Sequence, residues 1–127
     1  MPITPIKTLV ANAKAQIETM DQEQAEHLAN SGDILLVDIR DPRELDRDGR
    51  IPGAFHAPRG MLEFWIDPSS PYHKPALATD KKLVFFCASA WRSALSVKAL
   101  QDIGVENIAE LDGGFSAWKS RGAPVDL

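Results

Sequence analysis

The stretch "KLVFFCASAWRSALSVKAL", residues 82–100, carries the pattern that decides the fold. A short run of apolar, strand-forming residues ends at Cys87, and from Ser93 onward apolar residues recur at helical spacing. Only residues 88–92 lie between, so the chain must turn back sharply, and the Ser93 hydroxyl is predicted to cap the helix that follows. The stretch therefore predicts a strand–loop–helix unit of an α/β protein.

The same alternation runs along the rest of the chain. Apolar runs predict strands at residues 16–20, 34–39, 54–57, 82–87 and 107–111. Capping residues and helical spacing predict helices at residues 5–15, from Asp21 to near Gly32, from Asp41, and at 61–66, 93–103 and 115–120. These elements predict an α/β three-layer sandwich, with a mainly parallel central sheet of about five strands and helices on both faces.

The predicted organisation is one domain. No internal repeat, long linker or low-complexity tract divides residues 1–127, so the chain is expected to form a single domain. Residues 1–32 are expected to form an N-terminal helical segment packed on the sheet.

Composition and charge exclude several classes of function. A net charge of −4 disfavours a nucleic-acid binder or a protein of anionic membranes, because both need a cationic surface. No apolar stretch approaches the length of a membrane span, and the start does not resemble a secretory signal, so a soluble cytoplasmic protein is expected. The single cysteine cannot form an internal disulfide and is either an inert core thiol or a reactive one kept reduced.

The loop after Cys87 is the main candidate for a functional site. A tight loop that feeds a helix N-terminus directs backbone N–H groups inward and forms an anion-binding concavity, which favours the thiolate. Arg92 can grip two oxygens of an anionic substrate with its guanidinium fork. The predicted site residues are Cys87 as nucleophile and Ala88, Ser89, Ala90, Trp91 and Arg92 around it. The alternative is that Cys87 only finishes a core strand and that Arg92 is a solvated surface charge.

The spacing of this loop separates two chemistries. A cysteine-dependent phosphatase needs its arginine six positions after the cysteine, but here Arg92 stands at the fifth position and Ser93 at the sixth. The shorter loop forms a smaller cradle, which suits one additional sulfur atom better than a phosphate. His27, His56 and His73 are widely separated, so no metal site is expected.

Two segments of the sequence resemble the rhodanese-like sulfurtransferases. "LLVDIRDPRELDRDGRIPGAFHAPRG" resembles the N-terminal signature of this family, and "FFCASAWRSALSVKALQDIGVENIAELDGGFSAWKSRGAPV" resembles its active-site loop and C-terminal signature. The resemblance implies a sulfurtransferase that carries sulfur as a persulfide on Cys87 and needs no other cofactor. The implied donor is thiosulfate or a persulfide, and the implied acceptor is cyanide or a thiol, a protein thiol included.

The resemblance also implies roles for individual residues. The N–H groups of residues 88–92 would stabilise the persulfide, Arg92 would orient an anionic donor, and Trp91 would line the pocket entrance. Asp38 and Arg40, together with Ser93, would support the loop, and Arg40 is expected either to pair with Glu44 or to contact substrate.

One departure and two alternative functions accompany this reading. Ala90 stands where the family often has glycine, so a positive φ there would be strained. The alternatives are a non-catalytic module of this fold that binds or regulates a partner, and a cysteine-dependent phosphatase or arsenate reductase. Loop length and the lack of a resolving cysteine disfavour the second.

Overall fold

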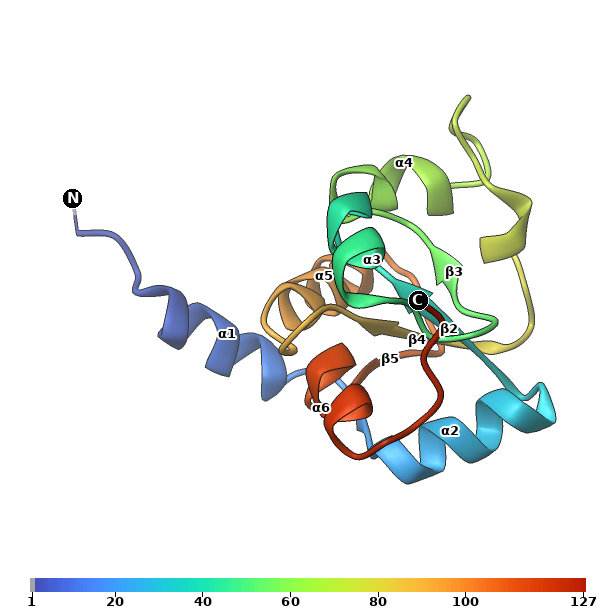
Figure 1. The fold of residues 1–127 in the computed structure, drawn as a ribbon. Coiled ribbons are helices and arrows are strands. Elements are labelled where there is room, and N and C mark those ends of the chain that lie inside the picture. Colours follow the sequence, from blue (N-terminus) through green and yellow to red (C-terminus); the bar gives the residue numbers. More distant parts are fainter. Residues whose placement is uncertain (1) are drawn as a thin grey trace.

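The sheet at the centre of the molecule has five parallel strands in the order β1-β5-β4-β2-β3 (Figure 1). The computed structural model describes residues 2–127. The strands are β1 Thr19–Met20, β2 Ile34–Asp38, β3 Phe55–His56, β4 Lys82–Phe86 and β5 Ile108–Leu111. The predicted α/β class with a parallel five-stranded sheet is confirmed.

Six α-helices connect and cover these strands in the part of the chain that the structure describes. They are α1 Ile6–Lys14, α2 Gln22–Ser31, α3 Pro42–Asp48, α4 Leu62–Ile66, α5 Arg92–Asp102 and α6 Gly114–Ser120, with short 3₁₀ turns at Arg59–Met61 and Pro75–Leu77. None of these helices is long and apolar enough to cross a membrane.

Local capping explains where two helices begin. The Asp21 carboxylate accepts hydrogen bonds from the N–H groups of Glu23 and Gln24 at the start of α2. Asp41 and Glu44 form a reciprocal capping box at the start of α3, with Pro42 in the first turn. Both helix starts agree with the sequence pattern, whereas α1 begins one residue later than predicted, with Pro5 rather than Thr4 at its N-cap.

Side chains of the central strands alternate between two cores, because successive residues of a strand point to opposite faces. On β4, Leu83 and Phe85 face a core completed by α4 and α5, and Cys87, just beyond the strand, belongs to the same core. Val84 and Phe86 face the opposite core, to which α2 and α6 contribute. The helices therefore cover both faces of the sheet, as the sequence predicts.

The two helices of the N-terminal segment lie on different partners. α2 contacts β2, whereas α1 runs along α5, where Val10 and Ala13 pack against Ala94. In Figure 1, α1 projects from the side of the molecule that α5 occupies. At its carboxyl end Lys14 reaches over α5 to the strand β5.

The carboxyl ends of β2 and β4 place two groups of functional interest at one edge of the sheet. Asp38, the last residue of β2, is in register with Phe86, and Cys87 follows immediately. Polar groups in open parallel sheets act from this edge, so the fold brings the Asp38 and Cys87 segments together.

Candidate active site

Cys87 lies directly after β4 and is almost completely buried, with 1% of its surface exposed. Its sulfur is 3.7 Å from the Ser93 hydroxyl, and the backbone N–H groups of Ser93 and Ser89 also hydrogen-bond to it. The loop thus wraps donors around a single sulfur atom.

The surroundings of the sulfur favour its ionised form. Burial opposes ionisation of the thiol, but the N–H and hydroxyl of Ser93, the N–H of Ser89 and the charge of Arg92 together outweigh burial and lower the pKa of Cys87. Because the thiolate is the nucleophilic form of cysteine, these surroundings favour a reactive thiol over an inert core residue.

The loop is held in a shape that costs backbone strain. Ala90 has φ of 67°, in the left-handed region that favours glycine, and its side chain is buried. The sequence analysis identified this position as one where a positive φ would be strained, and the structure has that conformation. Strain of this kind persists only where surrounding contacts enforce it.

Those contacts come from the start of α6. The N–H of Phe115 donates to the carbonyl of Cys87 at 2.8 Å, and the N–H of Ser116 donates to that of Ala88 at 2.9 Å. Gly114 has φ of 62°, and a Cβ on it would lie 2.5 Å from the Cys87 carbonyl oxygen. The "DGG" turn therefore lets α6 approach closely enough to fix the loop, which the sequence analysis interpreted only as a turn.

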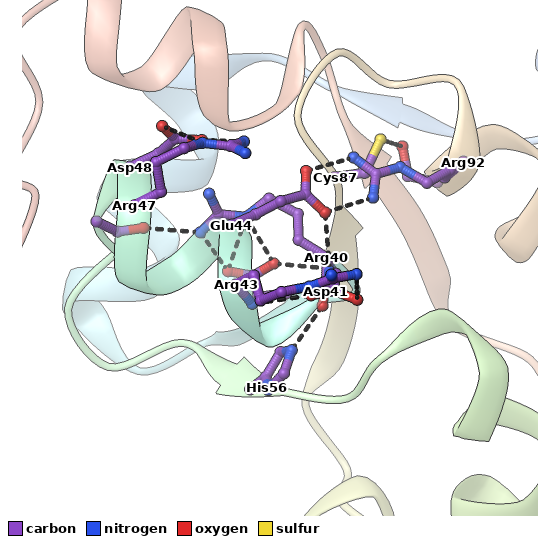
Figure 2. A network of polar contacts seen from close by, with 12 residues as sticks. Arg40, Asp41, Arg43, Glu44, Arg47, Asp48, His56, Cys87 and Arg92 are labelled. Atoms are coloured by element: carbon purple, nitrogen blue, oxygen red, sulfur yellow. Dashed lines mark hydrogen bonds and ion pairs between the residues drawn. The ribbon is translucent and has the colours of Figure 1, made fainter.

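Arg92 stands at the start of α5 and is held by a carboxylate from another helix (Figure 2). Its two terminal nitrogens donate to Glu44 of α3 at 2.7 and 2.9 Å. This pair lowers the pKa of Glu44, chiefly through the hydrogen bonds from Arg92, and raises that of Arg92. The site therefore combines a cation near Cys87 with a counter-ion that shields it.

Asp38 and Arg40 form a second, fully buried ion pair. The Arg40 Nε and Nη2 atoms donate to both carboxylate oxygens of Asp38, with Nη2 2.7 Å from Oδ2, and Nη2 also donates to the Gly49 carbonyl. The guanidinium carbon is 4.0 Å from the centroid of the Phe115 ring. Arg40 therefore braces the end of α3 and the first turn of α6, and its hydrogen bonds go to Asp38 and Gly49.

Two expectations about local contacts are wrong. Ser93 does not cap α5, because the helix begins at Arg92 with Trp91 at its N-cap, and the Ser93 hydroxyl is turned inward toward sulfur. Arg40 makes no hydrogen bond to Glu44, because its guanidinium is committed to Asp38 while Glu44 is committed to Arg92.

Glu110 is a polar residue of this region that the sequence analysis missed. It lies in the middle of β5 with a fully buried side chain, accepts a hydrogen bond from the Ser93 hydroxyl at 3.1 Å and forms an ion pair with Lys14. A carboxylate within the apolar run "NIAEL" was the available signal, since charged residues are rarely buried unless paired.

An open groove of about 480 Å³ lies beside the loop. Ala88 forms one wall, α6 contributes Phe115 and Lys119, and Asp48 closes the far side at the end of α3. Ala88 directly follows Cys87 in the sequence, so the groove lies next to the candidate nucleophile.

The predicted site residues are brought together with one distinction. The loop after β4 and the start of α5 contribute six of them: Cys87, Ala88, Ser89, Ala90, Arg92 and Ser93. Asp38 and Arg40 lie at the end of the neighbouring strand β2. Trp91, by contrast, is 42% exposed. Across residues 2–127, no cluster of three histidine, cysteine, aspartate or glutamate side chains could hold a metal ion.

Comparison with known families and structures fits this fold. The family model for the rhodanese-like domain matches residues 21–121. A protein from Allochromatium vinosum named as a sulfurtransferase is 31% identical over 110 residues, which cover 86% of this chain and 94% of that protein. The chain belongs to the rhodanese-like domain family, in which proteins named as sulfurtransferases occur.

Two solved structures are also similar. A protein of unknown function from Rhodopseudomonas palustris, described as a possible tyrosine phosphatase, is 51% identical with a TM-score of 0.90 and covers 99% of both chains. The polysulfide-sulfur transferase homodimer of Wolinella succinogenes is 34% identical, with a TM-score of 0.69 and coverage of 94% of this chain and 85% of that one.

Proposed function

We propose that this protein is a sulfurtransferase that carries sulfur as a persulfide on Cys87. The observation that carries the proposal is the buried Cys87 sulfur, whose pKa is lowered by loop N–H groups, the Ser93 hydroxyl and Arg92. In the proposed mechanism the nucleophile is the thiolate, which needs no general base, and donors close to the sulfur stabilise the charge of a covalent intermediate.

The proposed reaction has two balanced steps. The Cys87 thiolate attacks the outer sulfur of thiosulfate, the S–S bond of the donor breaks, and sulfite leaves with the bonding pair. The resulting Cys87 persulfide anion then gives its outer sulfur to cyanide, which forms thiocyanate, or to the thiolate of an acceptor, and the Cys87 thiolate returns. Ping-pong kinetics follow from this sequence.

The proposed partners are small anions and thiols. An anionic donor would reach Arg92 by competing with Glu44, and a thiol acceptor would approach along the groove beside Ala88. A thiolate intermediate of this kind operates in a reducing compartment, so we place the reaction in the cytoplasm.

A phosphatase is the second candidate, because the similar Rhodopseudomonas palustris structure is described as a possible tyrosine phosphatase. The loop argues against this candidate. Four residues, 88–91, separate Cys87 from Arg92, and Arg92 is committed to Glu44 through both terminal nitrogens. A phosphoryl group needs several oxygens gripped at once, and this loop offers its donors to one sulfur atom.

Mass spectrometry after exposure to thiosulfate tests the proposal. The intact protein is expected to gain one sulfur atom, lose it to cyanide with release of thiocyanate, and gain none as the Cys87→Ser variant. Tyr72→Phe, a change at an exposed aromatic residue outside the loop, serves as the control and should gain the sulfur. Hydrolysis of p-nitrophenyl phosphate without a sulfur adduct would instead establish the phosphatase.

A further inference from the structure

A chain of polar side chains runs from the Cys87 sulfur into the protein. The Ser93 hydroxyl is 3.7 Å from the sulfur and donates to Glu110 Oε2 at 3.1 Å, and Glu110 Oε1 is 2.5 Å from Lys14 Nζ. Three elements, α5, β5 and α1, supply Ser93, Glu110 and Lys14. The first twenty residues, including Lys14, lie outside the match to the family model.

Glu110 occupies an environment that favours its neutral form. Burial raises the pKa of Glu110, and the nearby charge of Asp112 acts in the same direction. The Lys14 ammonium and the Ser93 hydroxyl lower the pKa but do not offset burial. The segment that follows the adjacent strand β4 contributes one more titratable group, the Cys87 thiol. The Ser93 hydroxyl therefore lies between two acids, the Cys87 thiol and the Glu110 carboxyl group.

The Ser93 hydroxyl has one proton and can donate it in one direction only. When Glu110 is ionised, its carboxylate can only accept, so the hydroxyl donates to Glu110 and accepts from the thiol across the 3.1 and 3.7 Å separations. When Cys87 is ionised, the same hydroxyl is needed as a donor to sulfur. Charge on one acid therefore withdraws a hydrogen bond from the other.

We propose that Glu110 is a positioning residue that sets the ionisation of Cys87 through the Ser93 hydroxyl, the two acids sharing one proton. As the thiolate forms, the thiol proton passes to Ser93 Oγ, and the hydroxyl proton of Ser93 passes to Glu110 Oε2. The thiolate then accepts from Ser93, and neutral Glu110 donates to Ser93 Oγ. The net charge of the three groups Cys87, Ser93 and Glu110 is unchanged by this transfer. The Lys14 ammonium, on the far side of Glu110, shifts the proton equilibrium because it stabilises the Glu110 carboxylate. The role of Glu110 in catalysis rests on the proposed function.

The pH dependence of Cys87 alkylation by iodoacetamide tests the proposal. The chain has one cysteine, so the reagent reports on Cys87 alone. The wild-type protein should show two inflections, because strongly coupled acids titrate in two steps. The isosteric Glu110→Gln variant should show one inflection, at a pH about one unit below the upper inflection of the wild type. The reason is that a like charge is removed and the Ser93 hydroxyl is free to donate to the sulfur. An unchanged profile, or a shift to higher pH, would overturn the proposal.

A double-mutant cycle tests the part that Ser93 plays. In a Ser93→Ala background, Glu110→Gln should shift the profile by less than half as much as in the wild-type background, because the connecting hydroxyl is gone. Equal shifts in both backgrounds would mean that Glu110 acts directly through space and would refute the role of Ser93.

Lys14 offers a variant that keeps Glu110 and Ser93 in place. Its side chain is 36% exposed, so Lys14→Met should leave the fold intact. Loss of the ammonium should move the lower inflection to higher pH, and Lys14→Arg should restore it. A Lys14→Met profile equal to that of the wild type would contradict the proposal. Alkylation needs no sulfur donor, so these outcomes are independent of whether Cys87 forms a persulfide.

Discussion

Glu44 of α3 binds both terminal nitrogens of Arg92 at the start of α5, at 2.7 and 2.9 Å, although 48 positions separate the two residues in sequence. Bidentate pairing of this kind fixes the orientation of a guanidinium as well as its charge. The cation near Cys87 is therefore positioned by the first half of the chain, and under the proposed function an anionic donor would have to displace Glu44 from Arg92 or share Arg92 with it.

Substitutions of this pair should change the use of an anionic donor in opposite directions. Glu44→Gln should lower the KM for thiosulfate roughly threefold to tenfold, because Arg92 loses its competing carboxylate. Arg92→Ala should raise the same KM by a comparable factor. Steady-state kinetics at low and high salt measure both effects, and salt should reduce the benefit of Glu44→Gln. If neither variant altered the KM, Arg92 would have no role in donor binding.

The Glu44–Arg92 pair should also make stability depend on pH. The pKa of Glu44 is lowered in the folded protein. The stabilisation that Glu44 contributes is therefore fully present above its pKa in the unfolded chain, and it is lost as the pH falls through its pKa in the folded protein. Glu44→Gln should therefore cost about 1 kcal/mol near pH 7 and progressively less in acid, a small value because Arg92 is partly exposed. Urea unfolding at several pH values measures this difference, and a cost that is the same at all pH values would refute the linkage.

Gly114 should be intolerant of any side chain. A Cβ there meets the Cys87 carbonyl at 2.5 Å, so Gly114→Ala should destabilise the protein by about 2–4 kcal/mol and slow alkylation of Cys87. Gly122 is the matched control, because it also has a positive φ, of 79°, but nothing within 4 Å of the added atom. Gly122→Ala should cost only its backbone strain, about 1 kcal/mol. If the two variants lost the same amount of stability, the close contact between Gly114 and the Cys87 loop would make no contribution to it.

Ala90 should accept glycine but not a branched residue. Relief of the left-handed conformation in Ala90→Gly is offset by a lost buried methyl group and a more flexible unfolded chain, so stability should change by less than about 1 kcal/mol. Ala90→Val should cost about 2 kcal/mol or more and reduce sulfur loading, since a β-branched residue fits neither this φ nor the buried site. Thermal unfolding and persulfide yield measure both. A stable, active valine variant would show that the loop shape is not required.

Asp38 should be important for folding rather than for chemistry. Asp38→Asn leaves the Arg40 charge buried without its partner, which should cost about 3–5 kcal/mol. The fraction that remains folded should still load sulfur on Cys87, because the hydrogen bonds of Arg40 go to Asp38 and Gly49 rather than to the sulfur. Loss of loading in a fully folded variant, checked by circular dichroism, would instead place Asp38 in the reaction.

The sequence was sufficient to predict the elements and the position of the loop. Apolar runs and caps such as Asp21 and Asp41 act over a few residues, and the structure keeps them where the pattern puts them. The conflict between Ala90 and a positive φ was also local and visible in the sequence.

The partners of charged groups were less accessible to sequence reasoning. Arg40 and Glu44 are four positions apart and invite pairing, but the end of β2 turns Arg40 back toward Asp38. Arg92 and Glu110 find their partners across 48 and 96 positions. Such pairs depend on how strands are ordered in the sheet, which local spacing does not encode.

The start of α5 shows how a shift of two residues in the N-cap changes the role of Ser93. Ser93 is a good N-cap residue, and the prediction placed it there. Since the helix starts at Arg92, Ser93 lies inside the first turn and its hydroxyl is directed at Cys87 and Glu110 instead. Helix boundaries are set within one or two residues by local signals, and here that margin decides which groups touch the sulfur.

The hydrogen bonds from Phe115 and Ser116 to the carbonyls of Cys87 and Ala88 have a consequence for the newborn chain. Cys87 leaves the ribosome before the residues that tie its loop in place. Until residues 113–116 have followed and docked, the loop lacks these hydrogen bonds. The loop around Cys87 thus acquires its shape only when residues synthesised after it have docked.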